Sequence, residues 1–251
     1  MSILLALSFL TIFPFTRNRQ VEPPEMAASM AFFPLVGLWL GAILWGFDFE
    51  AGKYLNRTLI SALEVAIIAL LTGGLHLDGF SDTIDGMYGG RGDTTRTLEI
   101  MKDSRVGAMG VIGIAMLLIV KVVALSSLPT GVRGGALVLM PTISRWSQVQ
   151  MAINARYARK EASLARPFVE YLEFKHFAVA TVFAAGAVVI FGGTPGMIAF
   201  AASGLFTLAA RVYFHKKIGG ITGDTIGAVN ELDEVIVLLV YCGFTGFKVL
   251  G

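Results

Sequence analysis

The sequence has little charge and almost no cysteine, and both shortages narrow the class of protein. Only 15% of its 251 residues are charged, whereas 55% are hydrophobic. A soluble protein would carry about 25% charge, so the composition, with a mean hydropathy of +0.71, indicates an integral membrane protein. The single cysteine, Cys242, excludes an internal disulfide and a cysteine-based metal cluster. The net charge of +2 is too small to suggest a nucleic-acid partner.

Apolar stretches long enough to cross a bilayer recur along the chain. A transmembrane helix needs about 17–25 residues. About seven segments meet this requirement, near 27–47, 58–77, 107–127, 134–153, 176–192, 196–214 and 232–250. The first stretch, up to Pro14, lacks the features of a cleaved signal, and we expect a short re-entrant or interfacial helix there. Residues 1–251 are therefore predicted to form one all-α domain, a polytopic membrane helical bundle.

The loops between these segments alternate in length and charge. The long loops hold most of the lysines and arginines and cover 16–26, 78–106, 154–175 and 215–231. Basic loops stay in the cytoplasm. We therefore expect a multi-pass protein of the cytoplasmic (inner) membrane whose polar motifs face the cytoplasm. Helix faces rich in Gly and Ala, such as 201–210, would also permit packing between copies of the chain in the lipid bilayer.

Three aspartates in the run HLDGFSDTIDG (76–86) form the first candidate site. Asp78, Asp82 and Asp85 are spaced so that a helix would present all three on one face. Like charges repel unless a cation lies between them, and Mg²⁺ prefers such oxygen ligands. The alternative is a solvated helix end at which the aspartates act as caps. His76 would orient a carboxylate, act as a base, or make a structural hydrogen bond.

A second acidic run, GGITGDTIGAVNELDE, covers residues 219–234. Thr222 is expected to cap a helix that begins directly after it. Asp224 and Glu231 then share one face of that helix. Because acids that enter a membrane span are costly without a purpose, both are candidate metal ligands. Asn230 lies beside them and is a candidate substrate contact.

Basic residues near these acids are candidate phosphate ligands. Lys102 and Arg105 lie three residues apart in the run 96–110, and we expect them on one face. Asp103 would hold Arg105 in an ion pair, and it is included among the substrate-binding candidates. The alternative is ordinary anchoring of a span at the inner surface.

Further charged residues lie inside or beside the predicted spans. Arg145 falls in an apolar stretch, so it must bind an anion or form an internal ion pair. Arg156 and Arg159 are candidate substrate ligands, although such a cluster is more typical of a membrane-surface patch. Glu64 and Lys121 would pair with each other or extend towards the interface.

With these residues in view, the sequence resembles the cobalamin synthase (CobS) family nearly from end to end. The blocks that carry the resemblance are FFPLVGLWLG (32–41), TGGLHLDGFSDTIDG (72–86), LEIMKDSRVGAMGV (98–111), SRW (144–146), RYARKE (156–161) and GGITGDTIGAVNEL (219–232). The segment ASLARPF (162–168) departs from the glycine-containing turn that the resemblance leads us to expect there.

The resemblance implies an adenosylcobinamide-GDP ribazoletransferase that uses Mg²⁺. Such an enzyme joins adenosylcobinamide-GDP to α-ribazole, or its 5′-phosphate, and gives adenosylcobalamin, or its 5′-phosphate, and GMP. The ribazole 3′-hydroxyl would attack phosphorus, with Lys102 and Arg105 on the phosphate oxygens. The metal would lie between Asp78, Asp82 and Asp85, with Asp224 and Glu231 completing that site or holding a second ion. Asp82, Asp85 or His76 would accept the hydroxyl proton.

Three other classes of membrane protein share some of these features. A CDP-alcohol phosphotransferase would need an Ala-Arg pair after Asp78-Gly79, where this sequence has Phe80 and Ser81. A prenyltransferase uses aspartate-rich helices and Mg²⁺ but lacks the KDSR block. A cation transporter would carry acids near the middle of several spans, and only Glu64 is a candidate.

Overall fold

The computed structural model describes residues 2–16, 20–161 and 163–249, and every regular element in that part of the chain is a helix. The long helices are α3 (Phe33–Ala51), α4 (Arg57–Leu71), α5 (Leu75–Gly89), α7 (Ala108–Ser127), α8 (Thr130–Ala152), α10 (Phe174–Phe191), α11 (Gly193–Ile218) and α12 (Gly223–Val249). The shorter ones are α1 (Ser2–Leu10), α2 (Pro23–Ser29), η1 (Met30–Phe32), α6 (Thr94–Ile100) and α9 (Arg166–Glu170). The all-α bundle predicted from the sequence is confirmed.

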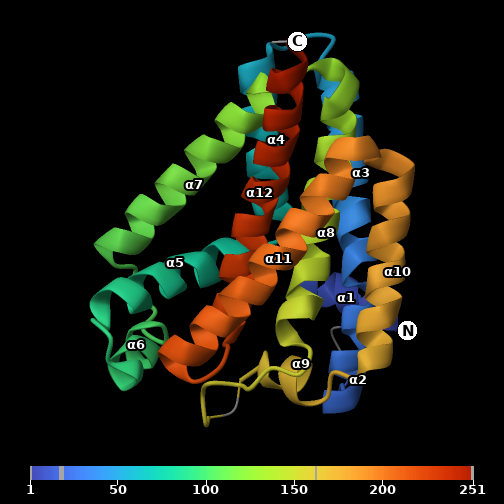
Figure 1. Ribbon diagram of the computed structural model, residues 1–251. Coiled ribbons are helices and arrows are strands. Elements are labelled where there is room, and N and C mark those ends of the chain that lie inside the picture. The colour runs from blue at the N-terminus through green and yellow to red at the C-terminus, as the bar shows by residue number, and fades with distance from the viewer. Residues whose placement is uncertain (1, 17–19, 162, 250–251) are drawn as a thin grey trace.

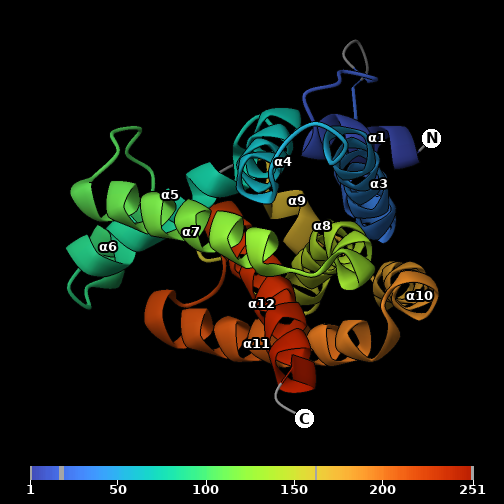
Figure 2. The same ribbon diagram turned by 90° about the horizontal axis from the view of Figure 1, so that it is seen from above.

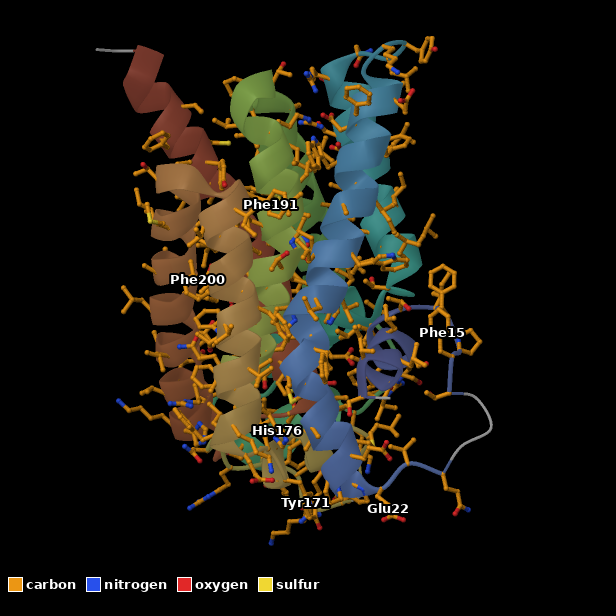
Figure 3. The ribbon with its side chains drawn as sticks, turned by 90° about the vertical axis from the view of Figure 1, so that its right-hand side faces the viewer. Phe15, Glu22, Tyr171, His176, Phe191 and Phe200 are labelled. Carbon is orange, nitrogen blue, oxygen red and sulfur yellow. The ribbon has the colours of Figure 1, made fainter. Side chains whose placement is uncertain are left out.

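The two ends of the bundle differ in what they carry. Figure 1 shows α2, α6, α9 and the connection between α11 and α12 at one end of the bundle. The α3–α4 connection and the end of α12 lie at the other end. Figure 3 places Glu22, Tyr171 and His176 at the first end, which we call the loop end. Helix α5 runs across the direction of its neighbours towards this end.

Four of the described segments are long and apolar enough to cross a membrane. They are Pro23–Ala51, Ala108–Ser127, Phe174–Phe191 and Gly193–Ile218, and they match four of the predicted spans. The predicted span 58–77 is instead a bent pair, α4 and α5, which raises the number to five if the pair counts as one. The predicted number of about seven spans is therefore not confirmed.

The bend between α4 and α5 measures 91° and occurs at two glycines. Gly73 and Gly74 have φ values of +60° and +71°, in the left-handed region that favours glycine. An α-helix cannot continue through two such residues. The aspartates at 78, 82 and 85 therefore lie on a separate helix, α5, rather than at the end of a straight span.

The helices α8 and α12 form the interior of the bundle, between α3, α7, α10 and α11 (Figure 2). Every residue of α8 from Ala136 to Ala152 is buried. A helix that other helices surround need not present an apolar surface to lipid. This position explains why α8 and α12 are long enough for the predicted spans 134–153 and 232–250 yet carry several charged residues.

The contact of α3 with α8, the most extensive among the described helices, depends on two glycines. A Cβ atom at Gly37 would collide with the backbone of Pro141 and Thr142. At Gly41 it would lie 2.6 Å from the Cα of Val138. Their spacing of four residues is the small-xxx-small pattern that lets membrane helices approach closely.

Buried ion pairs link the ends of the helices remote from the loop end. Arg133, fully buried, donates from Nε to Asp48 at 2.7 Å and also pairs with Glu64. These contacts join α8 to α3 and α4. Neither alternative expected for Glu64 and Lys121 is found, because Glu64 is buried against Arg133 and Lys121 is buried against two glutamates of α12.

The first helix is shorter than its apolar sequence suggested. Helix α1 ends at Leu10, before Pro14, and its nine residues extend about 14 Å. That length cannot cross a bilayer, which agrees with the expected re-entrant or interfacial helix. Ala6 and Leu10 are buried on the side that packs on α2 and α3.

We predict that Gly41→Ala lowers the stability of the bundle, because its Cβ meets backbone atoms that no side-chain rotation can move. The cost should be about 1–3 kcal/mol. Gly46→Ala, on the same helix with open space around its Cβ, should instead stabilise slightly through helix propensity. Thermal unfolding of both variants in detergent measures the difference. Equal unfolding temperatures would contradict this account of the α3–α8 contact.

Candidate active site

The acidic helices α5 and α12 touch at their backbones. A Cβ atom at Gly79 would lie 2.9 Å from the carbonyl oxygen of Asp224, and one at Gly227 would lie 3.3 Å from the Cα of His76. Both positions are glycine, so the helices approach more closely than side chains would allow. The contact brings Asp78 and Asp82 of α5 next to Asp224 of α12.

The start of α12 is fixed by two threonines. The backbone N–H of Thr222 donates to Oγ1 of Thr225 at 2.9 Å, and the N–H of Thr225 donates to Oγ1 of Thr222 at 3.2 Å. This reciprocal arrangement satisfies donors that a helix N-terminus leaves free. The prediction that Thr222 caps a helix beginning directly after it is confirmed.

A short extended segment places Arg159 against Asp224. The N–H of Ile221 donates to the carbonyl of Arg156 at 2.8 Å, and that of Ala158 donates to Ile221 at 2.9 Å. Arg159 then donates from Nη2 to Oδ2 of Asp224 at 2.6 Å. Arg159 therefore lies in the site, whereas the side chain of Arg156 is exposed on the surface.

Negative charge accumulates around Asp82. The carboxylates of Asp78, Asp224 and Asp85 all act on it, and Arg159 partly offsets them. Like charges that act on one another favour a bound cation or proton. Within the described ranges, however, no three His, Cys, Asp or Glu side chains converge as a complete set of metal ligands. Side chains alone therefore do not form a closed metal cage there.

Asp85 is engaged with the start of α7. Its Oδ2 accepts from the N–H of Gly107 at 2.7 Å, and its Oδ1 accepts from that of Gly110 at 2.8 Å. A Cβ at Gly110 would collide with Asp85 and Ser81. Asp85 thus acts as a cap for α7 and ties the preceding loop to α5.

That loop carries the predicted phosphate ligands Lys102 and Arg105. The predicted ion pair is confirmed, because Arg105 donates from Nη2 to Oδ2 of Asp103 at 2.6 Å. The Arg105 guanidinium lowers the pKa of Asp103 to about 2. The expectation that Lys102 and Arg105 share a helix face is wrong. Helix α6 ends at Ile100, and Asp103 bonds the backbone N–H of Arg105 in a turn instead.

A cavity of about 180 Å³ opens beside the aspartates. Its lining combines apolar side chains from α1, η1, α3 and α9 with five polar side chains, those of Asp78, Asp224, Arg159, His76 and Gln148. A larger hollow of about 590 Å³ lies along Gly73, Gly74 and Ser81 and also reaches Asp78. Asp78 is thus exposed to two separate spaces.

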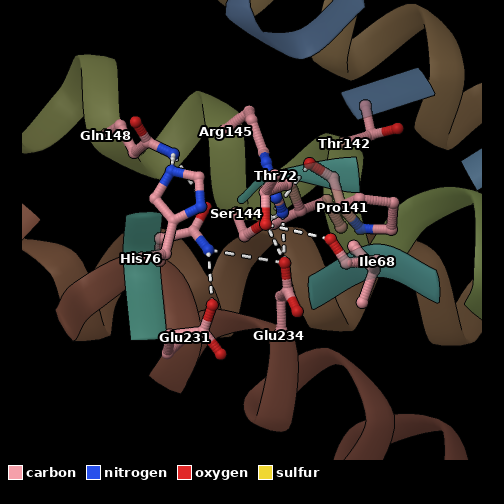
Figure 4. A network of polar contacts seen from close by, with 12 residues as sticks. Ile68, Thr72, His76, Pro141, Thr142, Ser144, Arg145, Gln148, Glu231 and Glu234 are labelled. Carbon is pink, nitrogen blue, oxygen red and sulfur yellow. Dashed lines mark hydrogen bonds and ion pairs between the residues drawn. The ribbon is translucent and has the colours of Figure 1, made fainter. Parts of the chain in front are cut away.

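A chain of amides leads from His76 into the bundle (Figure 4). The Nε2 of Gln148 lies 3.0 Å from Nε2 of His76 and donates to Oδ1 of Asn230 at 2.8 Å. Asn230 turns its Nδ2 towards Glu234 at 3.4 Å. Because a carboxylate only accepts, Asn230 must turn its NH₂ group towards Glu234 and its oxygen towards Gln148. Gln148 must then turn its own NH₂ group towards Asn230 and His76, so Gln148 donates to His76. The proton of the neutral imidazole then lies on Nδ1.

The hydrogen-bonded amides end at a buried cluster of four charged side chains. Lys121 donates to Glu231 at 2.5 Å and to Glu234 at 2.7 Å. Arg145 pairs with Glu234 and donates to Ser144 at 2.9 Å. Arg145 therefore makes an internal ion pair, the second alternative that the sequence left open. Glu231, a candidate metal ligand, faces Lys121 in this structure.

The structure thus brings together Asp78, Asp82, Asp224, Arg159 and His76 from the predicted set. Gln148 and Glu234 were missed. Polar residues at 144 and 148 within an apolar stretch were the available signal for Gln148, because a spacing of four places both on one face of α8. Nothing local indicates the pairing of Lys121 with α12, which joins positions more than 100 residues apart.

Comparisons with known proteins agree with the sequence motifs. The CobS family, described as cobalamin-5-phosphate synthase, matches residues 2–242. An adenosylcobinamide-GDP ribazoletransferase from Geotalea daltonii is 40% identical over 242 residues, which cover 96% of this chain and 97% of the relative. One from Syntrophobacter fumaroxidans is 40% identical over 239 residues, covering 93% and 94%. No solved structure matches the chain. The chain belongs to the CobS, or cobalamin-5-phosphate synthase, family.

Proposed function

We propose that this protein is an adenosylcobinamide-GDP ribazoletransferase, which joins adenosylcobinamide-GDP to α-ribazole or its 5′-phosphate and releases GMP. The relatives carry that name over nearly the whole length of the chain. One observation at the site supports it most strongly. Within the described residues, Nε of Arg159 and Nδ1 of His76 are buried N–H donors without a partner, and both residues line the cavity that holds Asp78 and Asp224.

Buried donors without partners cost free energy unless a ligand satisfies them. A phosphate oxygen is a suitable acceptor, because Arg159 is already held by Asp224 and its Nε is left to donate. We assign Arg159 and His76 to the diphosphate of adenosylcobinamide-GDP. Lys102 and Arg105 remain predicted phosphate ligands from the loop that Asp85 attaches to α5.

The carboxylates beside these donors suit Mg²⁺. All are hard oxygen ligands, and Mg²⁺ commonly uses one or two carboxylates together with substrate phosphates and water. Asp78 of α5 and Asp224 of α12 would hold it, which leaves the carboxylate of Asp82 beside the ion. Bound Mg²⁺ would neutralise charge on the phosphoryl oxygens. Asp85 and Glu231 remain predictions as ligands, since Asp85 caps α7 and Glu231 pairs with Lys121 here.

The proton of the ribazole hydroxyl is assigned to a carboxylate rather than to His76. Because Gln148 donates to Nε2 of His76, the imidazole presents a donor at Nδ1 and holds no free lone pair for a proton. Asp82 is partly buried beside the carboxylates of Asp78 and Asp224, and both its burial and these like charges favour its uptake of a proton. We assign the role of general base to Asp82, and that of a donor to phosphate to His76.

The loop end of the bundle is proposed to face the cytoplasm. The segment that carries Arg159 and Lys160 lies there together with the site, and so does the end of α11, which carries Lys216 and Lys217. Few lysines or arginines occur at the opposite end. The positive-inside tendency therefore supports a cytoplasmic active site in an inner-membrane protein.

Asp82→Asn should reduce GMP release by about 100-fold or more, because the variant loses both negative charge and the proton acceptor. Wild-type turnover should require Mg²⁺ and stop when a chelator removes it. The measurement is GMP formation by purified protein given both substrates. Glu99→Gln, which removes an exposed acid on α6, serves as the matched control. Normal turnover by Asp82→Asn would exclude Asp82 from the chemistry.

Two substitutions at His76 separate its assigned donor role from a base role. His76→Asn keeps an N–H near the position of Nδ1, whereas His76→Gln keeps one near Nε2. A donor role predicts at least about tenfold higher kcat for His76→Asn than for His76→Gln. If both variants are equally inactive, the assignment of Nδ1 as the donor fails.

Cysteine labelling tests the orientation, with Cys242→Ser as background. Leu164→Cys lies at the cavity and replaces a side chain that is 77% exposed. An impermeant maleimide should label it only in inside-out vesicles. Tyr54→Cys, in the α3–α4 connection at the opposite end, should react only in right-side-out vesicles. The reverse pattern would overturn the proposed orientation.

A further inference from the structure

Three phenylalanines from three helices contribute to the apolar lining of the cavity. Phe9 belongs to α1, Phe33 to α3 and Phe168 to α9. The ring centroids of Phe9 and Phe168 lie 4.5 Å apart, and those of Phe33 and Phe168 lie 5.8 Å apart. Met30 lines the cavity as well, and we call these four side chains the aromatic wall. A concave apolar surface opposite a few polar groups is the usual form of a small-molecule site.

We propose that the aromatic wall binds the base of the acceptor nucleoside, the benzimidazole ring of α-ribazole. The inference rests on the proposed function and adds the position of one substrate within the site. A nucleoside carries a flat base at one end and ribose hydroxyls at the other. The cavity offers a surface for each end, because the rings come from α1, α3 and α9 whereas the carboxylates of Asp78 and Asp224 come from α5 and α12.

The chemistry of the wall distinguishes the benzimidazole of α-ribazole from the guanine of the other substrate. Guanine carries several donors and acceptors on its edges, and the side chains of Phe9, Phe33, Phe168 and Met30 satisfy none of them. Burying guanine there would leave polar groups unpaired, which costs free energy. A benzimidazole has far fewer such groups and gains from contact with aromatic rings. The wall therefore favours the ribazole base over the guanine of the other substrate.

The position of α1 supports a binding role for Phe9. Phe33 and Phe168 are almost completely buried, at 1% and 3% exposure, whereas Phe9 is only partly buried. Phe9 also borders the second hollow at Asp78, so it lies between the two spaces. The short helix α1, which cannot span a membrane, would thus supply a ring to the substrate site.

Substitution of Phe9 tests the assignment. Phe9→Ala should weaken binding of α-ribazole and raise its KM about tenfold, as expected for loss of one base-stacking ring. The KM for adenosylcobinamide-GDP should stay unchanged. Phe9→Leu keeps apolar volume without a ring and should show the same trend more weakly. Phe15→Ala removes an exposed phenylalanine of the same segment that does not line the cavity, and serves as the control.

Binding of α-ribazole alone, measured by equilibrium dialysis, separates this inference from the proposed function. Unchanged ribazole binding in both Phe9 variants, with normal turnover, would overturn the assignment of the base and leave the proposed function intact. A raised KM for adenosylcobinamide-GDP alone would also overturn it, because the wall would then hold the other substrate. A wild-type protein that binds ribazole but forms no GMP would instead overturn the proposed function.

Discussion

The backbone contact between α5 and α12 is the constraint on which the site depends. Gly79 and Gly227 let the two helices meet without intervening side chains. Each helix carries acids near the crossing, so the close approach concentrates negative charge around Asp82. The charge would be unfavourable in a purely structural contact, because each carboxylate raises the cost of ionising its neighbours. A ligand that brings positive charge, or phosphate bound together with a cation, removes that cost.

The interior of the bundle stabilises the same contact in a different way. Lys121 of α7 and Arg145 of α8 pair with Glu231 and Glu234 of α12, so that the buried charges balance. Breaking such a pair leaves an uncompensated charge and costs far more than the pair itself contributes. Glu231 and Glu234 are therefore engaged by bases, unlike the free acids that would line the path of a cation transporter. Through Asn230 and Gln148 the cluster also sets which nitrogen of His76 carries the proton.

Local patterns in the sequence predicted much of this arrangement. The spacing of Asp78, Asp82 and Asp85 on a helix, the cap at Thr222 and the Asp103–Arg105 pair all depend on residues within a few positions of one another. The break at Gly73 and Gly74 could have been read from the glycine pair, but the apolar run across it indicated one straight span. The partners of Lys121, Glu64 and Arg145 depend on tertiary packing, and so does the aromatic wall, which three separate helices assemble. The predicted number of spans is not confirmed, because length does not distinguish the buried central helices α8 and α12 from the more apolar helices around them.

The central claim is that the α5–α12 crossing holds a divalent ion together with the diphosphate of the substrate. Electron–nuclear double resonance on the protein loaded with Mn²⁺ in place of Mg²⁺ tests it most directly. With adenosylcobinamide-GDP present, the claim predicts hyperfine coupling between the metal and substrate phosphorus, and loss of the bound ion in Asp78→Asn. Mn²⁺ that binds without phosphorus coupling, or that binds equally well to Asp78→Asn, would contradict the claim.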